Sequence, residues 1–154
     1  MIGKVHSHAV IGIDAAEVEV EADIAGGGAY FGIVGLPDAA VKESKDRVKS
    51  ALVNSGFFLS VERRIIINLA PADIRKEGAA LDLPIATALL GAQGVVDQGR
   101  LAAYSIVGEL SLDGRVKAIP GALCIADGAR RAGRKGLILP ADNANEAAVV
   151  QGVD

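Results

Sequence analysis

The alternation of apolar and charged residues over residues 17–24 is the clearest structural signal in the chain. Val18, Val20, Ala22 and Ile24 take one set of alternate positions, and acidic residues take the other. A period of two with one charged side is typical of an antiparallel strand that packs on a core by one face. We therefore predict a half-exposed strand. Its acidic row is either a solvated face that discourages edge pairing or a surface for a cation or a basic partner.

Comparable patterns predict the remaining elements. Strands are expected over residues 3–13, 30–34, 60–69, 105–112, 115–119 and 137–139, and helices over 38–54, 84–92, 122–132 and 142–150. Asp38, Asp82 and either Asp142 or Asn143 are suited to cap helices, and Asp113-Gly114 is a strong hairpin signal. Strands dominate early and alternate with helices later. The expected architecture is one α/β (α+β) domain over residues 1–154, with a mixed sheet and packed helices.

Two helices carry clusters of basic residues. On the helix over 38–54, Val41, Ser44, Val48, Ala51, Leu52 and Ser55 form the predicted inner stripe, and the outer face holds Lys42, Glu43, Lys45, Asp46, Arg47 and Lys49. This face is either a phosphate-binding surface or a set of pairs spaced i,i+4, such as Lys42–Asp46 and Glu43–Arg47. The second cluster ends the helix over 122–132 and comprises Arg130, Arg131, Arg134 and Lys135. A helix C-terminus favours cations, which is a structural explanation for this cluster. As the most basic short run in the chain, it is also the second candidate for a nucleic-acid contact.

Composition narrows the possible functions. The net charge is −3, and aromatic residues make up 3 % of the chain, so neither the overall charge nor a set of stacking rings favours nucleic-acid binding. The single cysteine excludes an internal disulfide and a thiolate metal site. No apolar run reaches the roughly 20 residues that a membrane span needs. We expect a cytoplasmic protein with no membrane contact.

The segment from residue 70 to residue 90 joins an apolar strand to an apolar helix through the loop 73–78. A strand, a glycine-bearing loop and a helix N-terminus are a common place for a nucleophile or a bound anion. Here Ala79 and Ala80 stand where a hydroxyl or thiol would be needed. Neither GxxxxGK[ST] nor GxGxxG occurs, so the chain offers no nucleotide-hydrolysing loop. His6 and His8 share one face of a predicted strand, but no third ligand is evident, and no metal site is expected.

Three blocks carry a resemblance to a known family: GIVGLPDAAVKES (32–44), NLAPADIRKEG followed by LDLPIA (68–86), and GELSLDGRV (108–116). Together they resemble the N-terminal domain of the magnesium-chelatase-like AAA+ ATPases, the ComM/YifB competence-protein group. The resemblance implies that an ATPase domain binding ATP and Mg²⁺ follows this domain in a longer protein. It also implies a homo-hexameric ring acting in DNA branch migration and natural transformation.

The same domain is similar to the proteolytic domain of Lon and the C-terminal domain of RadA, which implies a ribosomal-protein-S5-domain-2-like fold. Lon peptidases use a Ser–Lys dyad. By this resemblance Ala80 occupies the serine position and Leu123 the lysine position, and neither side chain can attack a carbonyl or take a proton. We therefore expect a non-catalytic scaffold without a cofactor of its own. The alternatives are a residual Ser–Lys peptidase using Ser105 or Ser111, and a protein-interaction module without DNA contact.

Overall fold

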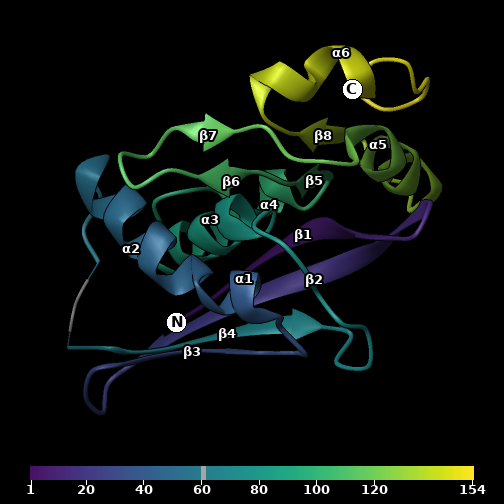
Figure 1. The fold of residues 1–154 in the computed structure, drawn as a ribbon. Helices are drawn as coiled ribbons and strands as arrows, with labels where there is room; N and C mark the ends of the chain where they lie inside the picture. Colours follow the sequence, from purple (N-terminus) through teal and green to yellow (C-terminus); the bar gives the residue numbers. More distant parts are fainter. Residues whose placement is uncertain (60–61) are drawn as a thin grey trace.

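Six strands form one mixed sheet in the computed structural model, which describes residues 1–59 and 62–154 (Figure 1). The sheet has the order β3-β4-β2-β1-β5-β8. Its strands are β1 (Ile2–Ile11), β2 (Asp14–Ala25), β3 (Tyr30–Val34), β4 (Arg64–Ala70), β5 (Tyr104–Ile106) and β8 (Gly136–Ile138). The pairs β1–β2 and β2–β4 are antiparallel, whereas β3–β4, β1–β5 and β5–β8 are parallel. The prediction of a mixed sheet with packed helices is confirmed.

One face of the sheet carries the larger core. Val18, Val20 and Ala22 of β2 are fully buried, as the alternation predicts. Helices α2 (Ser44–Asn54) and α3 (Asp82–Ala92) contribute buried side chains to the same cluster. The face therefore excludes water through ordinary aliphatic packing.

The opposite face is covered at one end by α5 (Ala122–Arg131). A side chain at Gly128 would meet the Ala15 carbonyl oxygen at 2.9 Å, so only glycine permits this close approach. A second, smaller cluster forms here with Leu137 of β8 and with Ala147 of α6 (Ala144–Ala147), which follows η1 (Ala141–Asn143) at the top of Figure 1. The Asn143 side chain bonds both the amide and the carbonyl of Ile119, each at 2.9 Å. The Asn143 side chain therefore makes no capping hydrogen bond to α6, which differs from the predicted cap.

Several boundaries differ from the sequence prediction. The helix predicted over 38–54 is divided at Glu43 into α1 (Ala39–Lys42) and α2, and Ser55 is exposed. The strand predicted over 105–112 is interrupted at Gly108, whose amide bonds the Ala80 carbonyl oxygen at 2.8 Å instead of a neighbouring strand. Beyond this break, β6 (Glu109–Leu110) pairs with β7 (Val116–Lys117) in the predicted hairpin.

The helix α4 (Gln98–Leu101), capped by Asp97, was not predicted. The predicted start of a strand at Ser60 lies outside the described residues. Over residues 1–59 and 62–154, none of the helices combines the length and the apolar character that crossing a bilayer requires.

Candidate functional sites: a cleft beside Gly78 and two basic surfaces

A cleft of about 480 Å³ lies beside the loop that follows β4. Its walls include the partly buried Ala80, and His8, Asp38, Glu77 and Gly78 contribute to its lining. Leu123, the other position of the expected dyad, is 43 % exposed on α5 and is not among the residues that line the cleft. The structure therefore places one dyad position in the cleft wall and the other on the surface of a nearby helix.

Lys76, in the same loop, is fully buried. Its ammonium donates hydrogen bonds to the carbonyl oxygens of Gly35 (2.7 Å) and Pro71. Its backbone amide bonds the Leu36 carbonyl at 3.0 Å, and its carbonyl accepts from the Asp38 amide at 2.9 Å. Burial lowers the pKa of Lys76. The side chain thus joins two loops, a role that its place in a polar sequence stretch did not indicate.

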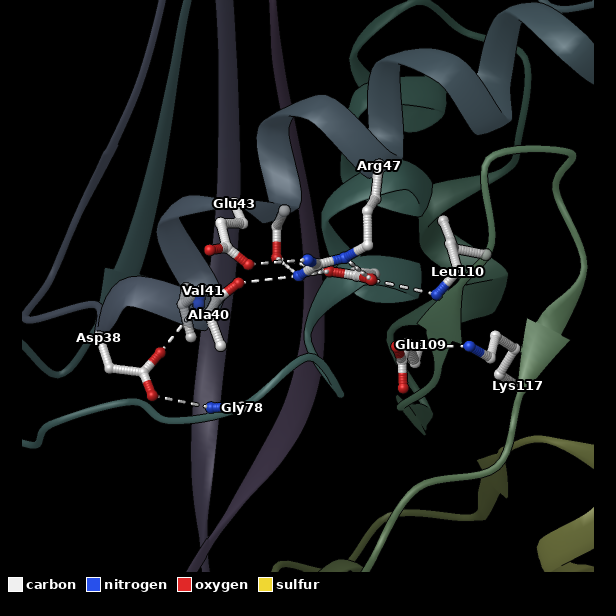
Figure 2. Close-up of polar contacts among 11 residues, drawn as sticks. Asp38, Ala40, Val41, Glu43, Arg47, Gly78, Glu109, Leu110 and Lys117 are labelled. Carbon is white, nitrogen blue, oxygen red and sulfur yellow. Dashed lines mark hydrogen bonds and ion pairs between the residues drawn. The ribbon is translucent and has the colours of Figure 1, made fainter.

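Asp38 holds the two sides of the cleft entrance together (Figure 2). One carboxylate oxygen accepts from the Val41 amide at 2.8 Å, which confirms the predicted helix cap. The other accepts from the Gly78 amide at 3.1 Å. Gly78 has φ +81°, a conformation that suits glycine.

A buried carboxylate, Asp82, links α2, α3 and β6. It accepts hydrogen bonds from the Ser44 hydroxyl (2.5 Å), from Arg47 Nε and Nη2 (2.7 and 3.1 Å), and from the Leu110 amide (3.0 Å). Arg47 also donates to the Ala40 carbonyl oxygen at 2.8 Å. The hydrogen bond to Asp82 raises the pKa of Arg47. Such charge-assisted pairs need fixed geometry and many donors, which this site provides.

This network corrects two sequence predictions. Asp82 was expected just before the helix, but it is the first residue of α3 and is fully buried, and its carboxylate binds Ser44 and Arg47 instead of capping the helix. Arg47 turns inward, with a side chain only 19 % exposed, although the helical pattern placed it on the outer face. Neither partner could be found from its own segment, because the two are 35 residues apart.

The first basic surface comprises Lys42, Lys45 and Lys49, which are exposed on α1 and α2. Among the ion pairs that join residues within 1–59 and 62–154, none includes these three lysines. The expected Lys42–Asp46 pair does not form, whereas Glu43–Arg47 does, at 3.5 Å. Within these residues no carboxylate neutralises the three ammonium groups, although that of Lys49 lies 5.3 Å from the centre of the Phe31 ring.

The second basic surface lies at the end of α5 and is already neutralised in part. Arg130 pairs with Asp127 at 2.8 Å. Arg131 pairs with the same carboxylate at 3.0 Å and with Asp14 at 3.5 Å. These pairs are exposed, so each stabilises the fold little, but together they satisfy the cations internally.

The remaining two cations of this surface also have partners. Arg134 holds both carboxylate oxygens of Glu17, at 2.7 and 2.9 Å, and this bonding lowers the pKa of Glu17. The ammonium of Lys135 lies 5.9 Å from the centre of the Tyr104 ring. The acidic row of β2 therefore meets a basic partner within the chain itself.

The histidines and the rival serines lie in structural contacts. His8 and Ser105 are both buried, and His8 Nδ1 lies 2.8 Å from Ser105 Oγ. His6 lies 3.8 Å from Glu17, and burial lowers the pKa of both histidines. Ser111 donates to Asp113 in the hairpin turn. In the described part of the chain, no group of three His, Cys, Asp or Glu residues is arranged to hold a metal ion.

Comparison with known proteins establishes the family. A family model described as subunit ChlI of Mg-chelatase matches residues 20–143. The chain is 44 % identical over 146 residues to the uncharacterized protein YifB of Salmonella typhimurium, covering 95 % of this chain and 28 % of that protein. It is 42 % identical over 153 residues to an uncharacterized Mycobacterium tuberculosis protein, Rv2897c, covering 99 % of this chain and 30 % of that one.

A further relative carries a functional name. The competence protein ComM of Haemophilus influenzae is 41 % identical over 146 residues, with 95 % of this chain and 28 % of ComM covered. The chain therefore belongs to the magnesium-chelatase-like family that includes YifB and ComM. It spans less than a third of the length of these relatives.

Proposed function

We propose that this chain is a non-catalytic scaffold and DNA-handling domain of a ComM-type magnesium-chelatase-like AAA+ ATPase. In this proposal the ATPase domain, with ATP and Mg²⁺, lies in the rest of a longer cytoplasmic protein that assembles as a homo-hexamer. The ring acts on branched DNA, in keeping with the competence role that the name of ComM indicates. The observation that carries the DNA contact is the row of exposed lysines on α1 and α2 that form no ion pair with any residue in 1–59 or 62–154.

The chemistry of the cleft supports a role without peptide hydrolysis. A Ser–Lys dyad needs a hydroxyl to attack the carbonyl and an amine to take the proton. Ala80 and Leu123 provide neither, and the ammonium of Lys76 is held by two carbonyl oxygens away from solvent. Ser105 is buried against His8, and the Ser111 hydroxyl is held by Asp113.

The lysine row can contact DNA although the chain as a whole is acidic. Lysine ammonium groups bind backbone phosphates and release condensed counterions, so a local patch is sufficient. In a ring, the same patch recurs in each subunit, and weak contacts add along one DNA molecule. A low affinity of one isolated copy is therefore compatible with firm binding by the assembly.

The test is DNA binding by the full-length protein, with the 154-residue chain measured beside it. Replacing Lys42, Lys45 and Lys49 together by Gln should weaken DNA binding by roughly tenfold or more at low salt, since up to three phosphate contacts are lost per subunit. Unchanged binding would contradict the DNA contact and favour the protein-interaction module.

A separate experiment addresses the peptidase alternative. A fluorophosphonate probe should leave the serines of the chain unlabelled. Stoichiometric labelling of one serine, identified by mass spectrometry as Ser105, Ser111 or another, would overturn the non-catalytic assignment. Ser105→Ala and Ser111→Ala variants are the matched controls, because labelling of a reactive serine disappears in only one of them.

A further inference from the structure

A small cavity of about 260 Å³ opens between β3 and α2. Lys45 and Lys49 line it from the helix, Phe31 and Ile65 line it from the sheet, and Arg63 lines it from the segment before β4. Ala29, Tyr30 and Asp46 complete the lining. Three separate segments, residues 29–31, 45–49 and 63–65, thus meet at one hollow, and two of them bring three cations to it.

The charge of this cavity is opposite to that of the protein. Three cationic side chains and one carboxylate, Asp46, line it, whereas the whole chain has a net charge of −3. Within the described residues, neither Lys45, Lys49 nor Arg63 forms an ion pair. A concave site with converging, unneutralised cations favours an anionic ligand group.

Two aromatic side chains, Tyr30 and Phe31, line the same space. The partly buried ring of Phe31 lies under the ammonium of Lys49, 5.3 Å from the ring centre. The ring of Tyr30, in contrast, folds over Gly32, where an added Cβ would meet it at 2.7 Å, and Arg64 stacks on it. Phe31 is therefore the ring that a ligand entering this cavity would meet.

We infer that this cavity binds one nucleotide of an unpaired DNA strand. Its phosphate lies among Lys45, Lys49 and Arg63, and its base packs on Phe31 in place of the Lys49 ammonium, which moves to the phosphate. The inference rests on the DNA contact proposed above. It adds Arg63 and Phe31 to the site, places Lys42 outside it, and specifies single-stranded DNA.

The choice of an unpaired strand follows from shape and stacking. In a duplex both faces of each base are covered by its neighbours, so a recessed ring has no base face to pack against. An unpaired base offers that face, and its stacking on an aromatic ring stabilises binding without selecting a sequence. The cavity is slightly smaller than the usual range of about 300–1,000 Å³ for small-molecule sites, which limits it to about one nucleotide.

The test compares single-stranded and duplex oligonucleotides on the 154-residue chain and on the full-length protein. Phe31→Leu keeps an apolar side chain of similar reach but removes the flat ring. It should weaken single-strand binding by about fivefold or more, while duplex binding changes by less than about twofold. Phe58→Leu, the same replacement at a ring that is 80 % exposed and outside the cavity, is the control and should change neither.

A second variant guards against misfolding of Phe31→Leu. Arg63→Gln changes an exposed side chain. For single-stranded DNA it should reduce the slope of log affinity against log salt concentration by roughly 0.7, which is the contribution of one phosphate contact. Competition separates the possible ligands: a deoxynucleoside monophosphate should displace the oligonucleotide better than inorganic phosphate at equal concentration.

The outcomes separate the two proposals. Equal effects of Phe31→Leu on both kinds of DNA, or no effect of Arg63→Gln on the salt slope, would overturn the nucleotide site. Competition by phosphate as strong as by the monophosphate would also overturn it. If the triple lysine variant still loses DNA affinity in these cases, the proposed DNA contact stands without the nucleotide site. If the lysine variant binds normally, both proposals fail.

Discussion

The two basic surfaces have similar numbers of cations, yet the fold treats them differently. At the end of α5, Arg130 and Arg131 share Asp127, and Arg134 holds Glu17. On α1 and α2, the three lysines have no such partners in the part of the chain that the structure describes. The comparison shows that the density of basic residues in a sequence does not identify a binding surface. What matters is which carboxylates the fold places beside them.

The same distinction holds within the single helix α2. Arg47 points inward and binds Asp82, whereas Lys45 and Lys49 are exposed and line the cavity between α2 and β3. Arginine suits the inward position because its planar guanidinium engages both carboxylate oxygens at once. Lysine suits the outer position because its hydrated ammonium on a flexible stem can reach a mobile phosphate.

The largest predicted effect is on the buried carboxylate. Asp82→Ala should lower the free energy of unfolding by about 3–5 kcal/mol, because Arg47 then loses its anion and the Leu110 amide its acceptor. Urea denaturation followed by circular dichroism measures this change. Asp46→Ala, at an exposed position of α2, is the control and should change the free energy of unfolding by less than about 0.5 kcal/mol. A loss below about 1 kcal/mol at Asp82 would contradict the structural role of the network.

A smaller effect is expected at the end of α5. Arg134→Ala should lower the free energy of unfolding by about 1 kcal/mol, because the pair with Glu17 is partly exposed and water screens it. Thermal unfolding measures the loss, and DNA affinity should stay within about twofold of the parent. A large loss of DNA affinity with unchanged stability would reverse the roles assigned to the two surfaces.

His6 and His8 of β1 should make the stability of the fold depend on pH. Burial lowers the pKa of His6 and His8 in the folded chain, so the unfolded chain binds more protons near pH 6.5. Stability should therefore be full above pH 6.5 and fall as the pH drops toward the folded-state pKa values. The lowered pKa of Glu17 adds a loss of the same sign below about pH 4.5. The positive charge of Arg134 also lowers the pKa of both histidines, and that of Arg131 lowers the pKa of His8, so both arginines favour neutral histidine.

Urea titrations between pH 7.5 and pH 5 test this sign. The doubly substituted variant His6→Gln, His8→Gln should show a flatter dependence than the parent, whatever its absolute stability. A parent chain that becomes more stable on acidification over this range would contradict the assignment of neutral, buried histidines.

The smallest stability effect should come from the first basic surface. Replacing Lys42, Lys45 and Lys49 by Gln should change the free energy of unfolding by no more than about 0.5 kcal/mol, because none of the ion pairs seen among the described residues is lost. Urea denaturation is again the measurement. A loss near 2 kcal/mol would mean that these lysines stabilise the fold. A weaker DNA affinity of the variant could then not be attributed to lost phosphate contacts.

The local patterns predicted much of the fold. The alternation in β2, the Asp38 cap and the Asp113-Gly114 turn depend on neighbouring residues, and all three are confirmed. The inward turn of Arg47 and the burial of Lys76 depend on partners from other segments. A single sequence without such pairings gives no signal for them, and both were read as polar surface.

The candidate sites divide in the same way. The two lysine- and arginine-rich clusters were visible in the sequence, but their different pairing was not, because Glu17 and Arg134 are 117 residues apart. Arg63 and Phe31 lie on separate segments and were not singled out as a site. They meet Lys45 and Lys49 only because β3 pairs with β4 beneath α2.

The most direct test of the division between the two surfaces is a salt series on two matched variants of the full-length protein. One replaces Lys42, Lys45 and Lys49 by Gln, and the other replaces Arg130, Arg131 and Lys135, so that each removes three positive charges. We predict that the first reduces the slope of log affinity against log salt by about 2 for single-stranded DNA, and that the second leaves it unchanged. Equal slopes for the two variants, or a loss confined to the second, would contradict the account.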